Sequence, residues 1–281
     1  MVWRLRAVAV AVTGCALAGA AVGWGESQTG TGSSTVSVEG MEMHYRVVGA
    51  GEPLVLLHGG IQSGEMFDPF VPDLSSEYRL IIPDLRGHGS STNPDGRWDT
   101  RQFARDVFAL LDHLGVERFR AVGVSAGGMT LLHMATQQPQ RVVAMVVVGV
   151  GTSLPASCRE VLARTDVDAY AEPVWAKLRA RHTHGDEQIR ALHAWIASLS
   201  RGPDDMSFTA AQLAPITAAT LVVHGDRDYC FPASMAWDIY SAIPEAYLWV
   251  VPNGGHVPID GALAPQFSAT VRAFFAGEWD H

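Results

Sequence analysis

Short, continuously apolar segments alternate along this chain with stretches of helical periodicity, and that alternation limits the folds it can adopt. Apolar runs at residues 54–57, 80–82 and 142–150 are typical of strands buried on both faces of a sheet. Segments such as 103–114 lie between them and place apolar residues at helical spacing. An antiparallel hairpin is predicted for residues 36–48, ahead of these elements. Strands that alternate with helices form a mostly parallel, doubly wound sheet with helices on both faces, so the predicted fold class is α/β.

Residues 152–214 interrupt this alternation. The segment has no strand-like run, and it carries helical stretches such as 174–181. Strand patterns resume at residues 221–223 and 247–251. We therefore interpret about residues 152–214 as a helical cap inserted into a single domain that extends over residues 36–281.

The first 25 residues have the organisation of an export signal. Two early arginines precede a short apolar run, and residues 18–20 are small enough for a signal peptidase. An alternative is a lipoprotein signal, in which Cys15 is the lipidated residue and anchors the protein to a membrane. Residues 26–35 are rich in glycine, serine and threonine, which is typical of a flexible linker. The sequence therefore predicts an exported protein, secreted or periplasmic.

Composition excludes several classes of function. With 48% apolar and 17% charged residues, the chain can bury a sizeable core. Its net charge of −9 argues against a nucleic-acid partner, which would require a basic surface. No apolar run is long enough for a membrane span in the mature chain.

In an oxidising compartment Cys158 and Cys230 either form a disulfide or remain two free thiols.

Reactive residue types occur where the predicted strands end, which is where sheets of this class place their active sites. Residues 123–127 read Gly-Val-Ser-Ala-Gly and lie between a predicted strand and a predicted helix. A serine on such a sharp turn requires small neighbours, and its hydroxyl points out of the sheet at the positive end of the helix. We therefore predict that Ser125 is a nucleophile.

A serine hydroxyl needs a general base. His256 follows the last predicted strand on a glycine-rich loop, from which it can reach over the sheet edge to the nucleophile. Two aspartates, Asp226 and Asp228, follow the preceding strand. Asp228 is the better candidate for orienting the histidine because it lies further into the loop, whereas Asp226 is expected to bond the loop backbone. Asp84 and Asp260 are weaker alternatives.

A tetrahedral oxyanion would need backbone N–H donors. Ala126, which follows the nucleophile, supplies one donor, and Gly60 in the loop at residues 58–61 supplies the other. Met66 and Phe67, just after that loop, are candidates for the wall of a substrate pocket. This chemistry requires neither a cofactor nor a metal.

Five segments of the chain, in this order and spacing, resemble motifs of the α/β-hydrolase fold superfamily, in particular of its capped serine esterases and lactonases. The resemblance covers about residues 36–280 and implies a serine–aspartate–histidine triad without a cofactor. It also implies that His58, Asp84, Arg86 and His88 are structural. The segments are residues 58–60, 84–90, 123–127, 224–228 and 254–256.

The function predicted from these residues is that of a serine hydrolase, which cleaves a small to medium carboxylic ester or lactone through an acyl-enzyme on Ser125. An alternative keeps the triad but makes the protein a C–C bond hydrolase, a lyase or a cofactor-free perhydrolase. A C–C hydrolase would need an arginine near the serine, and Arg159, Arg181 and Arg190 are available. A third hypothesis is a ligand-binding receptor of the same fold without enzymatic activity. In each case the expected partner is a small molecule.

Overall fold

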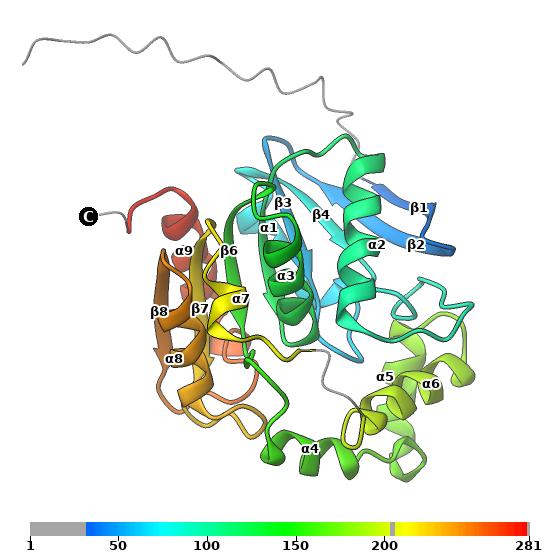
Figure 1. Ribbon diagram of the computed structural model, residues 1–281. Helices are drawn as coiled ribbons and strands as arrows, with labels where there is room; N and C mark the ends of the chain where they lie inside the picture. Colours follow the sequence, from blue (N-terminus) through cyan, green and yellow to red (C-terminus); the bar gives the residue numbers. More distant parts are fainter. Residues whose placement is uncertain (1–31, 203–205, 280–281) are drawn as a thin grey trace, which may run out of the picture.

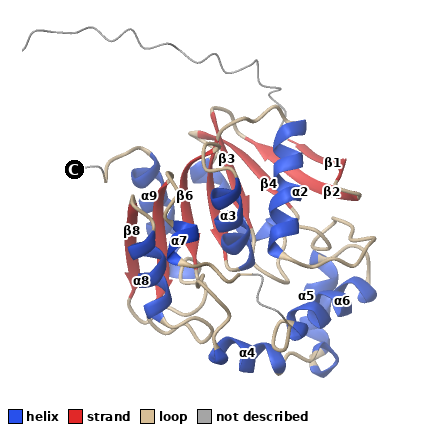
Figure 2. Ribbon diagram, in the orientation of Figure 1, coloured by secondary structure: helices blue, strands red, loops and turns tan. Residues whose placement is uncertain are grey.

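A computed structural model describes residues 32–202 and 206–279 and contains one eight-stranded sheet with helices on both faces (Figures 1 and 2). The predicted signal segment, including Cys15, lies outside the described residues. The strand order is β1-β2-β4-β3-β5-β6-β7-β8. The strands are β1 (Gly32–Val38), β2 (Met41–Val48), β3 (Glu52–Leu57), β4 (Tyr78–Pro83), β5 (Phe119–Val124), β6 (Val142–Val148), β7 (Ala219–Gly225) and β8 (Ala246–Val251).

Strands β3 to β8 run parallel to one another, whereas β2 pairs antiparallel with both β1 and β4. This arrangement is the doubly wound α/β sheet expected from the sequence. The helices are α1 (Val71–Leu74), α2 (Thr100–His113), α3 (Ala126–Gln137), α4 (Ala156–Ala163), α5 (Glu172–Arg181), α6 (Asp186–Ser198), α7 (Ala210–Leu213), α8 (Ala233–Ala242) and α9 (Ala264–Phe275), with short 3₁₀ turns η1 (Gly64–Phe67), η2 (Val167–Ala169) and η3 (Gly261–Leu263).

Strand β3 shows why the apolar runs are continuous. Successive residues point to opposite faces of a strand, and both faces of this sheet are covered. Val55 and Leu57 therefore pack into the core beneath α2 and α3, whereas Leu54 and Leu56 pack on the side of α1 and α9. All four side chains are fully buried.

The N-terminal hairpin begins earlier than predicted. Strand β1 starts at Gly32. Residues 32–35, which are the last four residues of the linker predicted at 26–35, therefore pair with β2 instead of forming a flexible segment. Sheet pairing uses backbone groups, which glycine, serine and threonine also possess, and the exposed edge position does not require apolar side chains. The hairpin turn is Glu39–Gly40, where both residues have positive φ, as a tight two-residue turn demands.

The segment predicted as a cap contains helices and no strand among its described residues. Helices α4, α5 and α6 lie beyond the carboxyl ends of the parallel strands (Figure 1). Helix α7 instead packs against α3 and α8 on a face of the sheet, and its Leu213 is part of the main core. The cap therefore ends before α7. Among the described residues, no helix combines the length and apolarity needed to cross a bilayer.

Candidate active site

Ser125 occupies the turn between β5 and α3. Its backbone has φ 51° and ψ −117°, a conformation that is sterically unfavourable for a residue with a side chain. Small neighbours make the turn possible, because a Cβ on Gly123 would lie 2.6 Å from the carbonyl oxygen of Gly127. A Cβ on Gly127 would lie 2.1 Å from the carbonyl oxygen of Leu57. Strand, turn and helix thus hold the serine hydroxyl above the edge of the sheet.

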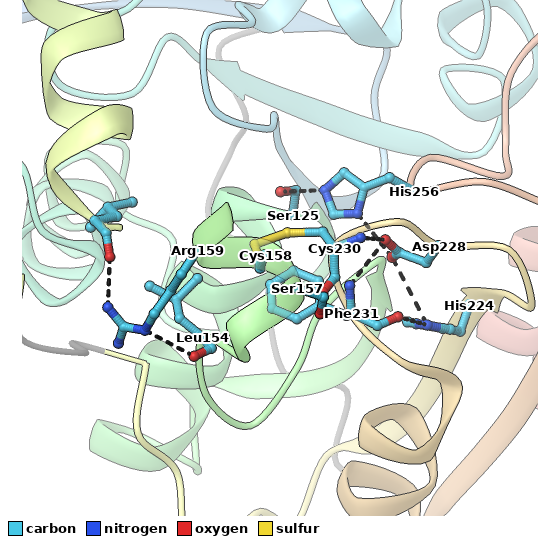
Figure 3. Close-up of a disulfide and its surroundings, with 11 residues drawn as sticks. Ser125, Leu154, Ser157, Cys158, Arg159, His224, Asp228, Cys230, Phe231 and His256 are labelled. Atoms are coloured by element: carbon cyan, nitrogen blue, oxygen red, sulfur yellow. Dashed lines mark hydrogen bonds and ion pairs between the residues drawn. A yellow bond between two sulfur atoms is a disulfide. The ribbon is translucent and has the colours of Figure 1, made fainter. Parts of the chain in front are cut away.

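The three residues predicted to act together lie within hydrogen-bond distance of one another (Figure 3). The Ser125 hydroxyl donates to Nε2 of His256 over 2.9 Å. Nδ1 of His256 donates to Oδ2 of Asp228, also over 2.9 Å. These two bonds require the neutral histidine tautomer that carries its proton on Nδ1. The unprotonated Nε2 faces the hydroxyl, which is the geometry that a general base needs.

Asp228 is held by its own loop. Its Oδ1 accepts backbone hydrogen bonds from Cys230 (2.7 Å) and Phe231 (3.1 Å), which leaves Oδ2 for His256. Burial alone would raise the pKa of Asp228, but these hydrogen bonds outweigh it and the pKa lies below its usual value. The carboxylate is therefore ionised and can stabilise a positive charge on the histidine.

The remaining aspartates have other surroundings. Asp226 was expected to bond the loop backbone, and this expectation is wrong, because Oδ1 of Asp228 accepts those bonds and Asp226 is exposed. Asp84 accepts backbone hydrogen bonds from Gly64 and Ser90, and hydrogen bonds that offset its burial lower its pKa to about 2. Asp260 lines the cavity described below but is not part of the hydrogen-bonded chain of three residues.

Gly60 and Ala126 lie side by side next to the nucleophile. A Cβ on Gly60 would lie 4.0 Å from the Cβ of Ala126 and 3.0 Å from Cδ1 of Ile196 in the cap. Over the described residues, neither backbone N–H donates a hydrogen bond to another protein group. Two neighbouring N–H groups that the fold does not use can donate hydrogen bonds to a tetrahedral oxyanion and stabilise its charge.

His58 holds the loop that contains Gly60. Its Nδ1 donates to the carbonyl of Gly59 over 2.8 Å, and its Nε2 accepts the backbone N–H of Leu85 over 2.9 Å. Burial lowers the pKa of His58, so the ring stays neutral in this position. This contact is structural, as the family resemblance implies.

A cavity of about 570 Å³ opens next to Ser125, between the sheet and the cap. Its walls are mainly apolar. Met66 lines the cavity as predicted, but Phe67 does not. Both lie on the short turn η1, where neighbouring side chains point in different directions. Phe67 points inward, is 1% exposed and packs against Phe70, which contributes to the cavity wall itself.

Sequence reasoning missed most of the cavity wall. The disulfide between Cys158 of α4 and Cys230, which the sequence left open, forms part of it. Arg181, one of the three arginines that the sequence offered for a substrate carboxylate, also lines it, at the end of α5. Further apolar residues of the cap that the sequence did not single out also line the cavity, and they are Leu154, Val161, Leu162, Ile196 and Leu199. Within residues 32–202 and 206–279, no group of three histidine, cysteine, aspartate or glutamate side chains is arranged to hold a metal ion.

Residues 52–174 match the family model described as alpha/beta hydrolase fold. The pimeloyl-[acyl-carrier protein] methyl ester esterase of Nitrosomonas europaea is 30% identical over 244 residues, which are 77% of this chain and 93% of the esterase. The dihydrolipoyllysine-residue acetyltransferase component of the acetoin cleaving system of Pseudomonas putida is 32% identical over 80% of this chain, but the match spans only 63% of that protein. The solved structure of Est816, titled an N-acyl homoserine lactone degrading enzyme, superposes with a TM-score of 0.70 at 25% identity and covers 86% of this chain and 100% of its own.

Proposed function

The chain belongs to the α/β-hydrolase fold family, and from this premise we propose that it is a serine hydrolase of small to medium carboxylic esters or lactones. The observation that carries the proposal is the unbroken hydrogen-bonded chain from Ser125 through His256 to Asp228, next to a largely apolar cavity. A cavity of about 570 Å³ is within the range that holds small organic molecules. One relative is named an esterase and one structural neighbour a lactone-degrading enzyme, which supports this substrate class.

In the proposed mechanism the Ser125 oxygen attacks the substrate carbonyl while Nε2 of His256 accepts the hydroxyl proton. The amides of Gly60 and Ala126 stabilise the oxyanion, and each donor is worth roughly 3 kcal/mol of barrier lowering. His256 then transfers the proton to the leaving alcohol, and the acyl group remains on Ser125. Water attacks this acyl-enzyme with His256 again as general base. Asp228 keeps the imidazole in the required tautomer and stabilises the imidazolium.

The test is a panel of p-nitrophenyl esters of graded chain length together with simple lactones. Ser125→Ala should remove nearly all turnover, and adding His256→Ala to it should cost little more, because the residues act as one unit. A fluorophosphonate probe should label Ser125 in the native protein, and mass spectrometry of the labelled peptide identifies the site. Full ester hydrolysis by purified Ser125→Ala would reject the nucleophile. A native protein that neither turns over the panel nor reacts with the probe would favour a ligand-binding receptor.

One observation favours a second candidate, a C–C bond hydrolase that acts on a substrate with a carboxylate. Arg181 lines the cavity, and its Nη1 donates to the carbonyl of Ile61 over 3.2 Å. Among the described residues no carboxylate forms an ion pair with it, and burial lowers the pKa of its guanidinium. A substrate carboxylate would supply the missing partner. Arg181→Gln should then raise KM for p-nitrophenyl esters of dicarboxylic acids and leave KM for neutral esters unchanged.

We also propose that the protein is exported. The disulfide supports this proposal, because such bonds persist in oxidising compartments and are rare in the cytosol. The signal itself falls within residues 1–25, outside the described part of the chain. Mass analysis of the mature N-terminus distinguishes a cleaved signal from a lipid on Cys15, and an intact N-terminus in the cytosolic fraction would refute export.

A further inference from the structure

Ile61, the residue after Gly60, has a backbone conformation that needs support. Its φ is 60°, in the left-handed region that a β-branched side chain strongly disfavours. Such a conformation persists only where surrounding contacts hold it. The loop itself contributes one such contact, since the N–H of Gln62 donates to the carbonyl of Gly59 over 3.2 Å and closes the turn.

The other contacts to Ile61 come from the cap. Its side chain packs against a small apolar cluster of the cap, and its carbonyl accepts hydrogen bonds from Nη1 of Arg181 at 3.2 Å and from Nε2 of His182 at 3.3 Å. The cap therefore contacts both the side chain and the carbonyl of Ile61. The cluster consists of Val167, Trp175, Leu178 and Ile189.

His182 is placed to donate in one direction only. It is 1% exposed, and its Nδ1 accepts the backbone N–H of Gly89 over 3.0 Å. That bond leaves the ring proton on Nε2, which faces the carbonyl of Ile61. Burial, more than any neighbouring charge, lowers the pKa of His182 to about 4, so the neutral ring predominates near neutral pH.

The cap segment that carries His182 is itself fixed to the core. The N–H of Thr183 donates to the carbonyl of Gly89 over 3.1 Å, and the side chain of Gln188 donates to the carbonyls of Gly87 and Gly89. At its other end, the cap is joined to the loop of Asp228 by the disulfide seen in Figure 3. The position of His182 is therefore set before any substrate binds.

Two peptide groups connect His182 to the proposed oxyanion donor. The carbonyl of Ile61 and the N–H of Gln62 belong to one planar peptide group, and the carbonyl of Gly59 and the N–H of Gly60 belong to another. In a trans peptide group the C=O and N–H bonds point in opposite directions. A hydrogen bond on the carbonyl of Ile61 therefore orients the N–H of Gln62 toward the carbonyl of Gly59. That bond, together with the one from His58 to the same carbonyl, directs the N–H of Gly60 the opposite way. Successive hydrogen bonds of this kind also polarise one another.

We propose that His182 is a positioning residue for the oxyanion hole, which acts from the cap through the peptide groups of Ile61–Gln62 and Gly59–Gly60. The inference rests on the proposed hydrolase function and deepens it. It gives the cap a part in catalysis beyond the selection of substrates. His182 forms and breaks no covalent bond in this role, because it only maintains the direction of the Gly60 N–H.

The experiment compares two substitutions that separate the two nitrogens of the ring. In His182→Asn the amide oxygen takes the place of Nδ1 and keeps the bond from Gly89, but the ring donor to Ile61 is lost and only Arg181 still donates to that carbonyl. In His182→Gln the amide nitrogen takes the place of Nε2 and keeps the donor to Ile61, but the acceptor for Gly89 is lost. Thr183→Val serves as the matched control, because it removes a neighbouring cap contact to Ser90 that does not touch this loop.

Turnover of p-nitrophenyl butyrate and the rate of labelling by a fluorophosphonate are measured for all four proteins, with thermal unfolding as a check on folding. We expect His182→Asn to lower kcat on the order of tenfold with KM within twofold, and to slow labelling by a similar factor. His182→Gln and Thr183→Val should keep kcat within about threefold of the native protein. If His182→Asn does not fold, His182→Ser replaces it and should show the same selective loss of kcat, because it also removes the ring donor to Ile61.

Native kcat in His182→Asn, or an equal loss in His182→Gln, would overturn the inference while leaving the proposed function intact. A rise in KM without a change in kcat would also overturn it, since that result would indicate a substrate contact and not a positioned donor. A native protein that neither hydrolyses the ester nor reacts with the probe would reject the proposed function, and this inference with it.

Discussion

The disulfide between Cys158 and Cys230 should make a large contribution to stability. It joins helix α4 of the cap to the loop that carries Asp228, over a sequence separation of 72 residues. In the chain-entropy model, cross-linking a loop of that length lowers the entropy of the unfolded chain by about 15 cal/mol/K, or about 4.4 kcal/mol at 25 °C. We therefore expect its removal to lower the free energy of unfolding by about 4 kcal/mol.

The perturbation is reduction by a dithiol, or the double substitution of Cys158 and Cys230 by serine, followed by urea unfolding at pH 7 monitored by circular dichroism. For a chain of this size, 4 kcal/mol corresponds to a decrease in Tm of roughly 10 °C. The double variant should be insensitive to the dithiol. Ser157→Ala removes the hydrogen bond from Ser157 to the carbonyl of Cys230 but keeps the bridge, so it should cost only about 1 kcal/mol. Identical unfolding midpoints for the oxidised and reduced proteins would refute the reasoning.

Three further predictions test the site and its surroundings. Asp228→Asn should lower kcat roughly 10⁴-fold without changing the circular dichroism spectrum, because a neutral amide holds the wrong histidine tautomer. Gly127→Ala should destabilise the fold by about 3 kcal/mol or more in urea unfolding, since its Cβ would lie 2.1 Å from the carbonyl oxygen of Leu57. Gly255→Ala, whose Cβ would meet nothing within 4 Å, is the control. The lowered pKa of His182, about 4, means that between about pH 6.5 and pH 4 the unfolded chain binds a proton that the folded chain does not. Stability should therefore fall with decreasing pH over that window, by up to about 3 kcal/mol from this residue, and His182→Asn should flatten the decrease in urea unfolding series.

The parts of the site that the sequence predicted are those governed by local geometry. A strand followed by a serine between glycines leaves few backbone solutions, so Ser125 could be placed on a strand-to-helix turn without any knowledge of the rest of the chain. The carboxyl ends of parallel strands meet at one edge of the sheet, which brings His256 and Asp228 toward it. The choice between Asp226 and Asp228 followed from their distance along the loop.

The predictions differ from the structure where side-chain direction, strand pairing or helix packing depends on residues far away in the chain. Met66 and Phe67 are neighbours with similar hydropathy, and only the packing of η1 against the core sends one to the cavity and the other inward. The predicted linker ended too late because strand pairing at Gly32–Val38 depends on a partner strand and not on side-chain type. Helix α7 was counted with the cap, although its contacts are with α3 and α8.

The sequence alone determined the alternation of strands and helices, the mostly parallel sheet and the three residues at its edge. Short-range sterics and strand topology are sufficient to specify these features. The tertiary structure decided which cap residues line the cavity, that Cys158 and Cys230 pair, and that His182 reaches Ile61. His182 and Ile61 are 121 positions apart in the chain. Contacts over such distances depend on the orientation of the cap, which the packing of the whole chain determines and no local pattern encodes.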